Sequence, residues 1–218
     1  QLGLTPHFID VGKNTFVANV SQIKKAINKK TKAIMIPNLL GNVPNWKEIY
    51  SIAKNKKIKI IEDSADTIGY KFNKKNFGNY SDITTNSMYA SHIITGAGFG
   101  GMVCFKDRKL YDKAKLLRGW GRSSAVFNES ENINKRFNVK ISGIDYDAKY
   151  IFSDLGYNFL PSEISAAFAL EQIKKLKNNV LIRNKNFEYL KKFFKNFEKY
   201  FKLPEQNIGV KTPWLAFP

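Results

Sequence analysis

The chain has 218 residues, of which 43% are hydrophobic, 14% aromatic and 25% charged, a composition typical of a folded protein with a sizeable core. It contains no apolar run of the roughly 18 residues that a membrane span needs, and residues 1–10 lack the basic and apolar pattern of a secretory signal. The single cysteine, Cys104, excludes an intrachain disulfide and any all-cysteine zinc or iron–sulfur site. These features predict a cytoplasmic protein.

The formal net charge is +18, from 36 lysines and arginines against 18 acidic residues. Such a balance is found in nucleic-acid-binding proteins, but only five of the 36 are arginines, and arginine is the better reader of phosphates and base edges. The lysines are scattered among many Asn, Ile and Phe residues, which favours a solvated lysine-rich surface. Nucleic-acid binding remains an alternative, and it predicts a steep salt dependence.

Apolar runs alternate with amphipathic segments along the chain, the pattern of an α/β domain. In chain order, the sequence predicts a helix at 22–28 after Ser21, a strand at 33–36, a helix at 46–54, strands at 58–61, 83–88 and 102–105, a helix at 108–118, an exposed loop at 123–150, a helix at 163–176 after Ser162, a second long helix at 179–200, and the start of a strand in 212–218.

Two carboxylates, Asp63 and Asp66, follow the predicted strand 58–61. Ligands of open α/β sheets bind at the carboxyl ends of the strands, where a carboxylate can meet a cationic ring nitrogen. A turn or a helix cap accounts for the same residues equally well.

The segment 86–103, NSMYASHIITGAGFGGMV, places Ser87 and His92 between a predicted strand and a glycine-rich turn. Glycines allow a ligand to approach the backbone and leave amides free for a phosphate, although a tight hairpin gives the same pattern. His92 is one of only two histidines, and a structural and a catalytic role are equally compatible with its position. The scattered carboxylates give no metal-ligand spacing, so we expect no metal site.

Three segments together carry a resemblance that covers most of the chain: TKAIMIPNLLGNVPNW at 31–46, residues 60–103 beginning IIEDSADTIGY, and LGYNFLPSEISAAFALEQIKKL at 155–176. In this order they resemble the sugar aminotransferase family that uses pyridoxal phosphate, named for DegT, DnrJ, EryC and StrS. The resemblance implies the central part of an aspartate-aminotransferase-like large domain, with a mostly parallel sheet flanked by helices.

The resemblance also implies roles for individual residues. The aspartate matching Asp63 pairs with the pyridine nitrogen and makes the cofactor an electron sink, and the serine matching Ser87 holds the cofactor phosphate. The asparagine matching Asn158 reaches the phosphate from the neighbouring subunit, which implies a homodimer with a shared active site. Together with Asp66, these are the expected cofactor-binding residues.

One departure from the family pattern concerns the Schiff-base lysine, whose position five residues after the serine is occupied here by His92. An imidazole cannot form the imine, and this substitution resembles the 3-dehydratases of nucleotide-linked 4-keto-6-deoxyhexoses. DYDAKY at 145–150, LRGWGRSS at 117–124 and Asp66 indicate the same branch. In the implied reaction, pyridoxamine phosphate condenses with the 4-keto group, His92 removes a proton as the catalytic base, and the 3-hydroxyl leaves.

Two further departures refine this expectation. Some dehydratases of the group carry an iron–sulfur cluster on cysteines near the WGR segment, where this chain has Ser123 and Ser124, so the implied type is cluster-free and releases ammonia. The family's Gly-Glu-Gly-Gly appears as 98–101, Gly-Phe-Gly-Gly, in a segment one residue longer.

The resemblance implies that family segments precede Gln1 and follow Pro218. We expect residues 1–178 to form part of the large cofactor domain and 179–218 to form a connecting helix and the start of a small C-terminal domain, so these 218 residues alone are expected to be inactive. Two alternatives remain: an aminotransferase in which Lys71, Lys74 or Lys75 forms the imine, and a non-catalytic relative with the same fold.

Overall fold

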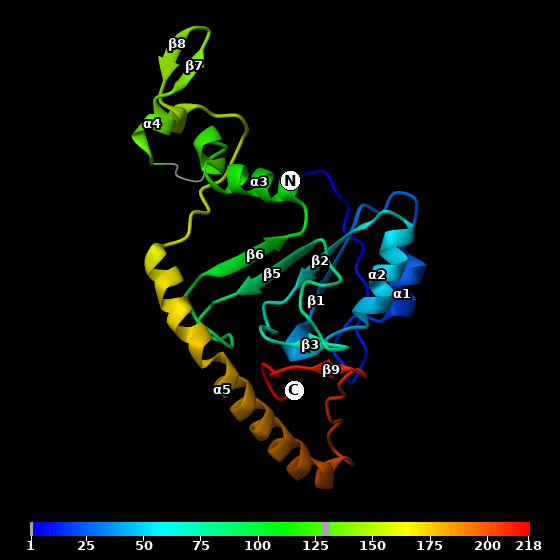
Figure 1. The fold of residues 1–218 in the computed structure, drawn as a ribbon. Coiled ribbons are helices and arrows are strands. Elements are labelled where there is room, and N and C mark those ends of the chain that lie inside the picture. Colours follow the sequence, from blue (N-terminus) through cyan, green and yellow to red (C-terminus); the bar gives the residue numbers. More distant parts are fainter. Residues whose placement is uncertain (1, 128–130) are drawn as a thin grey trace. The chain divides into compact units, whose positions relative to one another are not determined.

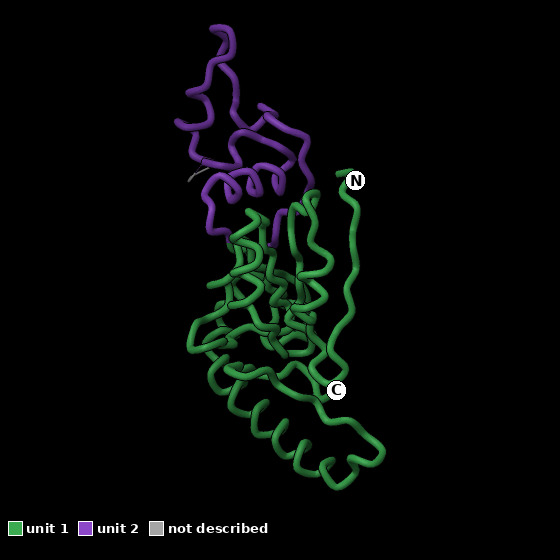
Figure 2. Tube along the Cα trace, turned by 90° about the vertical axis from the view of Figure 1, so that its right-hand side faces the viewer, with its two compact units in different colours: residues 1–104, 163–218 green, residues 105–162 purple. Residues whose placement is uncertain are grey.

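The computed structural model describes residues 2–127 and 131–218 (Figure 1). The helices of these residues are α1 (Val20–Ala26), α2 (Trp46–Asn55), α3 (Arg108–Arg118), α4 (Ile133–Arg136) and α5 (Glu163–Phe194), with the 3-10 turns η1 (Leu39–Gly41), η2 (Ser123–Val126), η3 (Ala148–Tyr150) and η4 (Lys195–Phe197). The strands are β1 (Ala33–Pro37), β2 (Lys59–Asp63), β3 (Lys71–Phe72), β4 (Lys75–Asn76), β5 (Ile83–Ser87), β6 (Gly101–Phe105), β7 (Val139–Ile141), β8 (Ile144–Tyr146) and β9 (Val210–Lys211). The chain forms two compact units, unit 1 (Gln1–Cys104 with Glu163–Pro218) and unit 2 (Phe105–Ser162), which are coloured separately in Figure 2.

The principal sheet has the strand order β1-β2-β5-β6. β1, β2 and β5 run parallel, and their register places Pro37 beside Asp63 and Asp63 beside Thr85. Helix α2 makes the crossover from β1 to β2, as a parallel pair requires. The expected mostly parallel sheet flanked by helices is therefore confirmed.

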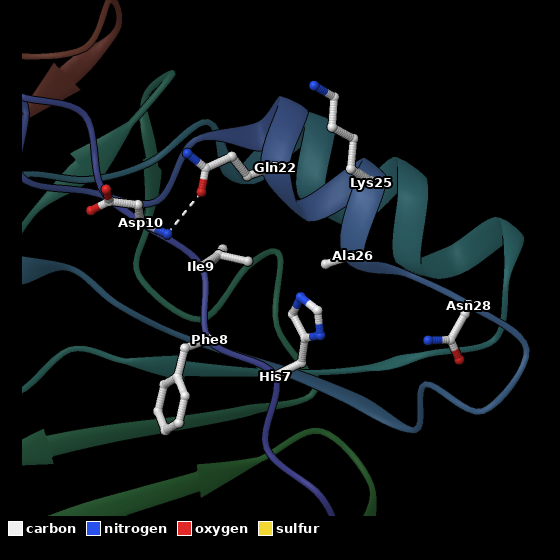
Figure 3. A pocket seen from close by; sticks show the side chains of 8 residues that line it. All are labelled: His7, Phe8, Ile9, Asp10, Gln22, Lys25, Ala26 and Asn28. Atoms are coloured by element: carbon white, nitrogen blue, oxygen red, sulfur yellow. Dashed lines mark hydrogen bonds between the residues drawn. The ribbon is translucent and has the colours of Figure 1, made fainter.

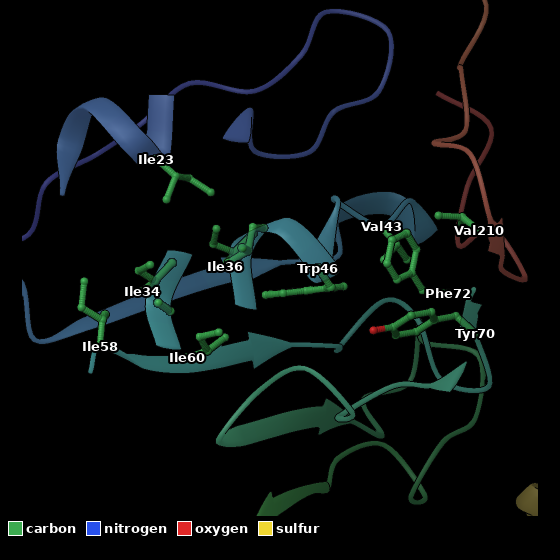
Figure 4. Close-up of a cluster of buried hydrophobic side chains, with 12 residues drawn as sticks. Ile23, Ile34, Ile36, Val43, Trp46, Ile58, Ile60, Tyr70, Phe72 and Val210 are labelled. Carbon is green, nitrogen blue, oxygen red and sulfur yellow. The ribbon is translucent and has the colours of Figure 1, made fainter. Parts of the chain in front are cut away.

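Helices α1 and α2 cover one face of this sheet and build its core (Figure 4). The buried side chains of α2 are Trp46, Ile49 and Ala53, spaced three and four residues apart so that they share one face of the helix. They pack in the same cluster as Ile34 and Ile36 of β1 and Ile60 of β2. Asn45 caps α2 by accepting a hydrogen bond from the backbone N–H of Glu48.

The alternation of side chains along the strands separates this core from the opposite face of the sheet. In β2, Ile60 and Glu62 are buried, whereas Asp63 is only partly buried. In β5, Thr84 and Asn86 are buried, and Thr85 between them belongs to the other face, as do Ile83 and Ser87. At the carboxyl ends of β2 and β5, one face of the sheet is therefore buried in the core and the other is partly open.

Helix α5 is a continuous helix of 32 residues, so the prediction of two helices divided near residue 178 was wrong. Residues 177–179 are polar, but they include no glycine or proline to interrupt the helix. Phe187 stacks on Trp214 with a centroid distance of 4.3 Å, and Arg183 Nη1 donates to the carbonyls of Trp214 and Leu215. Among the described helices, none is long and apolar enough to cross a membrane.

Two other predictions needed correction in unit 1. Asn19, rather than Ser21, caps α1, because its side chain accepts from the Ser21 N–H and the helix begins at Val20. The strand expected within 212–218 lies earlier, as β9, which pairs antiparallel with β3. The predicted boundary between 178 and 179 falls inside α5 and stays a prediction.

In unit 2, the expected exposed loop at 123–150 is partly ordered into short elements. The described residues of this stretch form η2, α4, the antiparallel hairpin β7–β8 and η3, while 128–130 lie outside the described residues. The hairpin turns at Ser142 and Gly143, both of which have a positive φ. Short polar segments gave no periodicity from which these elements could be predicted.

Candidate active site

Asp63 ends β2 on the sheet face opposite the core. Its Oδ1 accepts hydrogen bonds from the Ala65 N–H and from Thr85 Oγ1, each at 3.1 Å. Among the described residues, no partner is recorded for Oδ2. Asp63 therefore offers a fixed carboxylate with one oxygen available at the strand end.

His92 lies between two polar side chains, which we call the Asp66–His92–Ser87 chain. Its Nδ1 is 3.1 Å from Ser87 Oγ, and its Nε2 is 3.3 Å from Asp66 Oδ1. The His92 and Asp66 side chains are each 17% exposed, so solvent reaches them only in part. Both ring nitrogens are thus engaged, and the plane of the imidazole is fixed.

Backbone groups hold the two ends of this chain. The Leu40 N–H donates to Asp66 Oδ2 at 2.9 Å, and the Tyr89 N–H donates to Ser87 Oγ at 3.2 Å. Whether Ser87 Oγ donates to Nδ1 or accepts from it depends on the tautomer of His92, because a hydroxyl oxygen that accepts from Tyr89 can still do either. The Tyr89 ring meets the imidazole edge to face at 6.3 Å.

The glycine-rich turn folds back on the end of β5. The Gly96 N–H donates to the Met88 carbonyl at 2.7 Å, and a Cβ at Gly96 would lie 2.5 Å from the Phe99 carbonyl oxygen. Gly98 has a φ of +106°, a conformation that other residues rarely adopt. The turn therefore requires glycine, and it fixes the backbone that follows His92.

Unit 1 brings together four of the five predicted site residues at one edge of the sheet: Asp63, Asp66, Ser87 and His92. The fifth, Asn158, is exposed and belongs to unit 2. There it forms a β-bridge with Gly119, next to the hydrogen bond from the Trp120 N–H to the Tyr157 carbonyl. The roles assigned to these five residues stay predictions.

Sequence reasoning missed Glu62, which directly precedes Asp63. Its carboxylate is 0% exposed and accepts hydrogen bonds from five residues, which with Glu62 we call the Glu62 cluster. The donors are Asn38, Ser64, Tyr70, the backbone N–H of Gly78, and Ser81. Burial and the neighbouring negative charge of Glu62 raise the pKa of the Tyr70 hydroxyl far above its ordinary value. Strand alternation, which places residue 62 on the face of Ile60, was the signal that could have revealed it.

The other histidine, His7, lines a separate concavity of about 420 Å³ between the N-terminal segment and α1 (Figure 3). There Gln22 Oε1 accepts from the Asp10 N–H at 2.7 Å. None of the five predicted site residues lines this concavity. Within the described part of the chain, no group of three or more His, Cys, Asp or Glu residues is arranged to hold a metal ion.

The residues at the sheet edge fit a phosphorylated pyridine cofactor. The available oxygen of Asp63 suits a protonated ring nitrogen, and the Ser87 hydroxyl suits a phosphate. His92 supplies a base within contact of both a hydroxyl and a carboxylate. This donor set can bind the ring, orient it and move a proton.

Comparison with known proteins gives the site a context. A sequence model described as the DegT/DnrJ/EryC1/StrS aminotransferase family matches residues 1–218. The lipopolysaccharide biosynthesis protein RfbH of Salmonella typhimurium is 35% identical over 221 residues, which cover 100% of this chain and 50% of that protein. A GDP-perosamine synthase of Escherichia coli O157:H7 is 32% identical over 79% of this chain and 41% of its own length.

A solved structure supports the same relationship. The E. coli GDP-4-keto-6-deoxy-D-mannose 3-dehydratase with bound hydrated PLP has a TM-score of 0.79 and 31% identity, over 96% of this chain and 52% of that one. The expected fold, that of the large domain of pyridoxal-phosphate-dependent enzymes, is confirmed. The chain spans about half the length of the curated relatives it matches.

Proposed function

The chain belongs to the DegT/DnrJ/EryC1/StrS aminotransferase family, and on that premise we propose that it is part of a 3-dehydratase of a nucleotide-linked 4-keto-6-deoxyhexose. The proposed cofactor is pyridoxamine phosphate, exchanging with pyridoxal phosphate. The observation that carries the proposal is the Asp66–His92–Ser87 chain, which presents an oriented imidazole at the position where the family resemblance expects a lysine.

In the proposed reaction, Asp63 binds the ring nitrogen through its available oxygen and Ser87 binds the phosphate. Asp66 orients the imidazole of His92, which takes up a proton and returns it. Pyridoxamine phosphate, when bound, supplies the amine for the 4-keto carbon and the electron pair that allows the 3-hydroxyl to leave. General base catalysis of this kind contributes about 10²–10⁴-fold to a rate.

We further propose a homodimer in which Asn158 of one subunit reaches the cofactor phosphate of the other. Its exposure in unit 2 is compatible with a contact to another chain. The reaction is proposed to proceed without an iron–sulfur cluster, since the chain holds one cysteine, Cys104. Its exposed free thiol fits the reducing cytoplasm. Because the chain spans about half of its relatives, we propose that these residues carry only part of the site and are inactive alone.

The second candidate function is a nucleotide-sugar aminotransferase, which the similarity to GDP-perosamine synthase favours. It requires another lysine to form the imine. Lys71, Lys74 and Lys75 are all exposed and lie in or beside the β3–β4 hairpin, and Lys75 Nζ lies over the Tyr80 ring at 5.2 Å. This arrangement supports the dehydratase over the aminotransferase.

The test supplies the full-length protein with a nucleotide-linked 4-keto-6-deoxyhexose and pyridoxamine phosphate. A dehydratase yields a sugar with one oxygen atom fewer, together with ammonia, while the cofactor amine is oxidised to the aldehyde. His92→Asn should lose this activity, and Lys75→Gln, the matched control, should keep it. A 4-amino sugar that retains its 3-hydroxyl would instead establish the aminotransferase.

A further inference from the structure

The buried carboxylate of Glu62 lies one residue from the strand-end carboxylate of Asp63, on the other face of the sheet. An unpaired buried charge is costly, so its complete burial demands compensation. The Glu62 side chain is fully buried, so it cannot contact a ligand directly.

Both oxygens of Glu62 are saturated by donors. Oε1 accepts from Asn38 Nδ2 at 3.1 Å, Ser64 Oγ at 2.8 Å and Tyr70 OH at 2.5 Å. Oε2 accepts from the Gly78 N–H at 3.0 Å and Ser81 Oγ at 2.9 Å. An ionised carboxylate has only acceptor sites, and five donors match it better than an amide or a protonated acid.

The donors come from separate parts of unit 1, so the Glu62 cluster ties the end of β2 to its surroundings. Asn38 follows β1, and its Oδ1 accepts from Trp46 Nε1 of α2 at 2.8 Å. Gly78 and Ser81 lie between β4 and β5. Ser64 and Tyr70 lie between β2 and β3, so three connecting segments supply donors to this side chain, and α2 is linked to it through Asn38.

The same network reaches the backbone of Asp63. The Asn38 N–H donates to the Asp63 carbonyl at 2.8 Å, and the Ser64 N–H donates to the Thr85 carbonyl at 2.9 Å. The backbone at and after Asp63 is thus anchored, which keeps the Asp63 side chain on the open face of the sheet.

We propose that Glu62 is a positioning residue that holds the Asp63 carboxylate in line with the ring nitrogen of the cofactor. The inference rests on the proposed function, since it assumes that Asp63 binds that nitrogen. Its prediction is specific: removing the charge of Glu62 weakens recognition of the ring nitrogen and not binding of the phosphate.

The experiment compares the affinity of the protein for pyridoxal phosphate and for an analogue in which a CH group replaces the ring nitrogen. We expect the wild type to prefer pyridoxal phosphate by about tenfold, as for one charge-assisted hydrogen bond, and Asp63→Ala to abolish the preference. Glu62→Gln should reduce it by about threefold or more while the affinity for the analogue stays unchanged.

Glu48→Gln is the matched control, because the Glu48 side chain on α2 is 42% exposed and is paired with Lys24, and it should leave the preference intact. If Glu62→Gln does not fold, Tyr70→Phe removes a single donor and should reduce the preference in the same direction. A wild type without any preference would overturn the proposed role of Asp63 and this inference with it. A preference lost in Asp63→Ala but fully retained in Glu62→Gln or Tyr70→Phe would overturn the positioning role alone.

Discussion

Glu62 and Asp63 are neighbours in β2 and carry the same functional group, yet their surroundings differ. Glu62 is 0% exposed and is held by five donors. Asp63 lies on the opposite face, is partly buried, and accepts two hydrogen bonds on one oxygen. The pleat of a single strand thus separates a carboxylate that stabilises the fold from one that is available to a ligand.

This comparison shows how Asp63 can be held in place while one of its carboxylate oxygens still has no hydrogen-bond partner among the described residues. Asp63 can keep one oxygen free for a ligand because the backbone around it is held by hydrogen bonds from Asn38 and to Thr85. The cost of burying a charge is offset on the face of Glu62 by hydrogen bonds from several elements. Substitutions on the two faces should therefore have different consequences.

The largest effect is expected for Glu62→Ala, which leaves five buried donors without their acceptor. We expect the free energy of unfolding to fall by about 3–5 kcal/mol. Denaturant unfolding of the variant and the wild type measures this loss. A loss below about 1 kcal/mol would show that the cluster is not a stabilising element.

The next largest effect is expected on cofactor affinity, for a substitution of Asp63 on the open face of the sheet. Asp63→Ala should reduce the affinity for pyridoxal phosphate by about 10–100-fold, because a charge-assisted hydrogen bond is lost, while the free energy of unfolding changes by less than about 1 kcal/mol. Fluorescence titration and denaturant unfolding give the two quantities. An Asp63→Ala variant that is destabilised but binds pyridoxal phosphate normally would contradict the assignment of Asp63 to ligand binding rather than to stability.

A single donor of the Glu62 cluster should have an intermediate effect. Tyr70→Phe should cost about 1.5–3 kcal/mol at neutral pH, the range for a hydrogen bond to a charged group. Since the pKa of Tyr70 is raised in the folded state, its contribution is present below the tyrosine pKa of the unfolded chain and is lost as the pH rises above it. The stability difference between the two proteins should shrink in alkaline solution, and a difference that grows there would contradict the assignment.

The smallest effect is expected in unit 2, where Arg136 pairs with Asp147. The hydrogen bond from Arg136 lowers the pKa of the Asp147 carboxyl, so the stabilisation is present above the ordinary aspartate pKa and is lost as the pH falls through the lowered value. Asp147→Asn should lower the melting temperature slightly at neutral pH, and the difference should vanish in acid. Thermal unfolding at several pH values checks this, and a difference that increases in acid would be inconsistent with the lowered pKa.

Much of unit 1 could be predicted from the sequence because its strands are short apolar runs between clear turn residues. Asp63, Ser87 and His92 were found because they follow such runs and match family motifs. Glu62 was missed since its five partners are scattered between residues 38 and 81, and no local pattern brings them together. The break expected near residue 178 was wrong because polar residues alone do not end a helix.

The most direct test of the role of His92 is borohydride reduction of the full-length protein after incubation with stoichiometric pyridoxal phosphate. Mass spectrometry of its peptides then locates any pyridoxyl adduct. Fluorescence in parallel reports that the cofactor binds. If His92 occupies the lysine position of the family site, the wild type binds the cofactor without a pyridoxyl adduct, and His92→Lys gains one at residue 92. A stable adduct on any lysine of the wild type would contradict the dehydratase account and favour an aminotransferase.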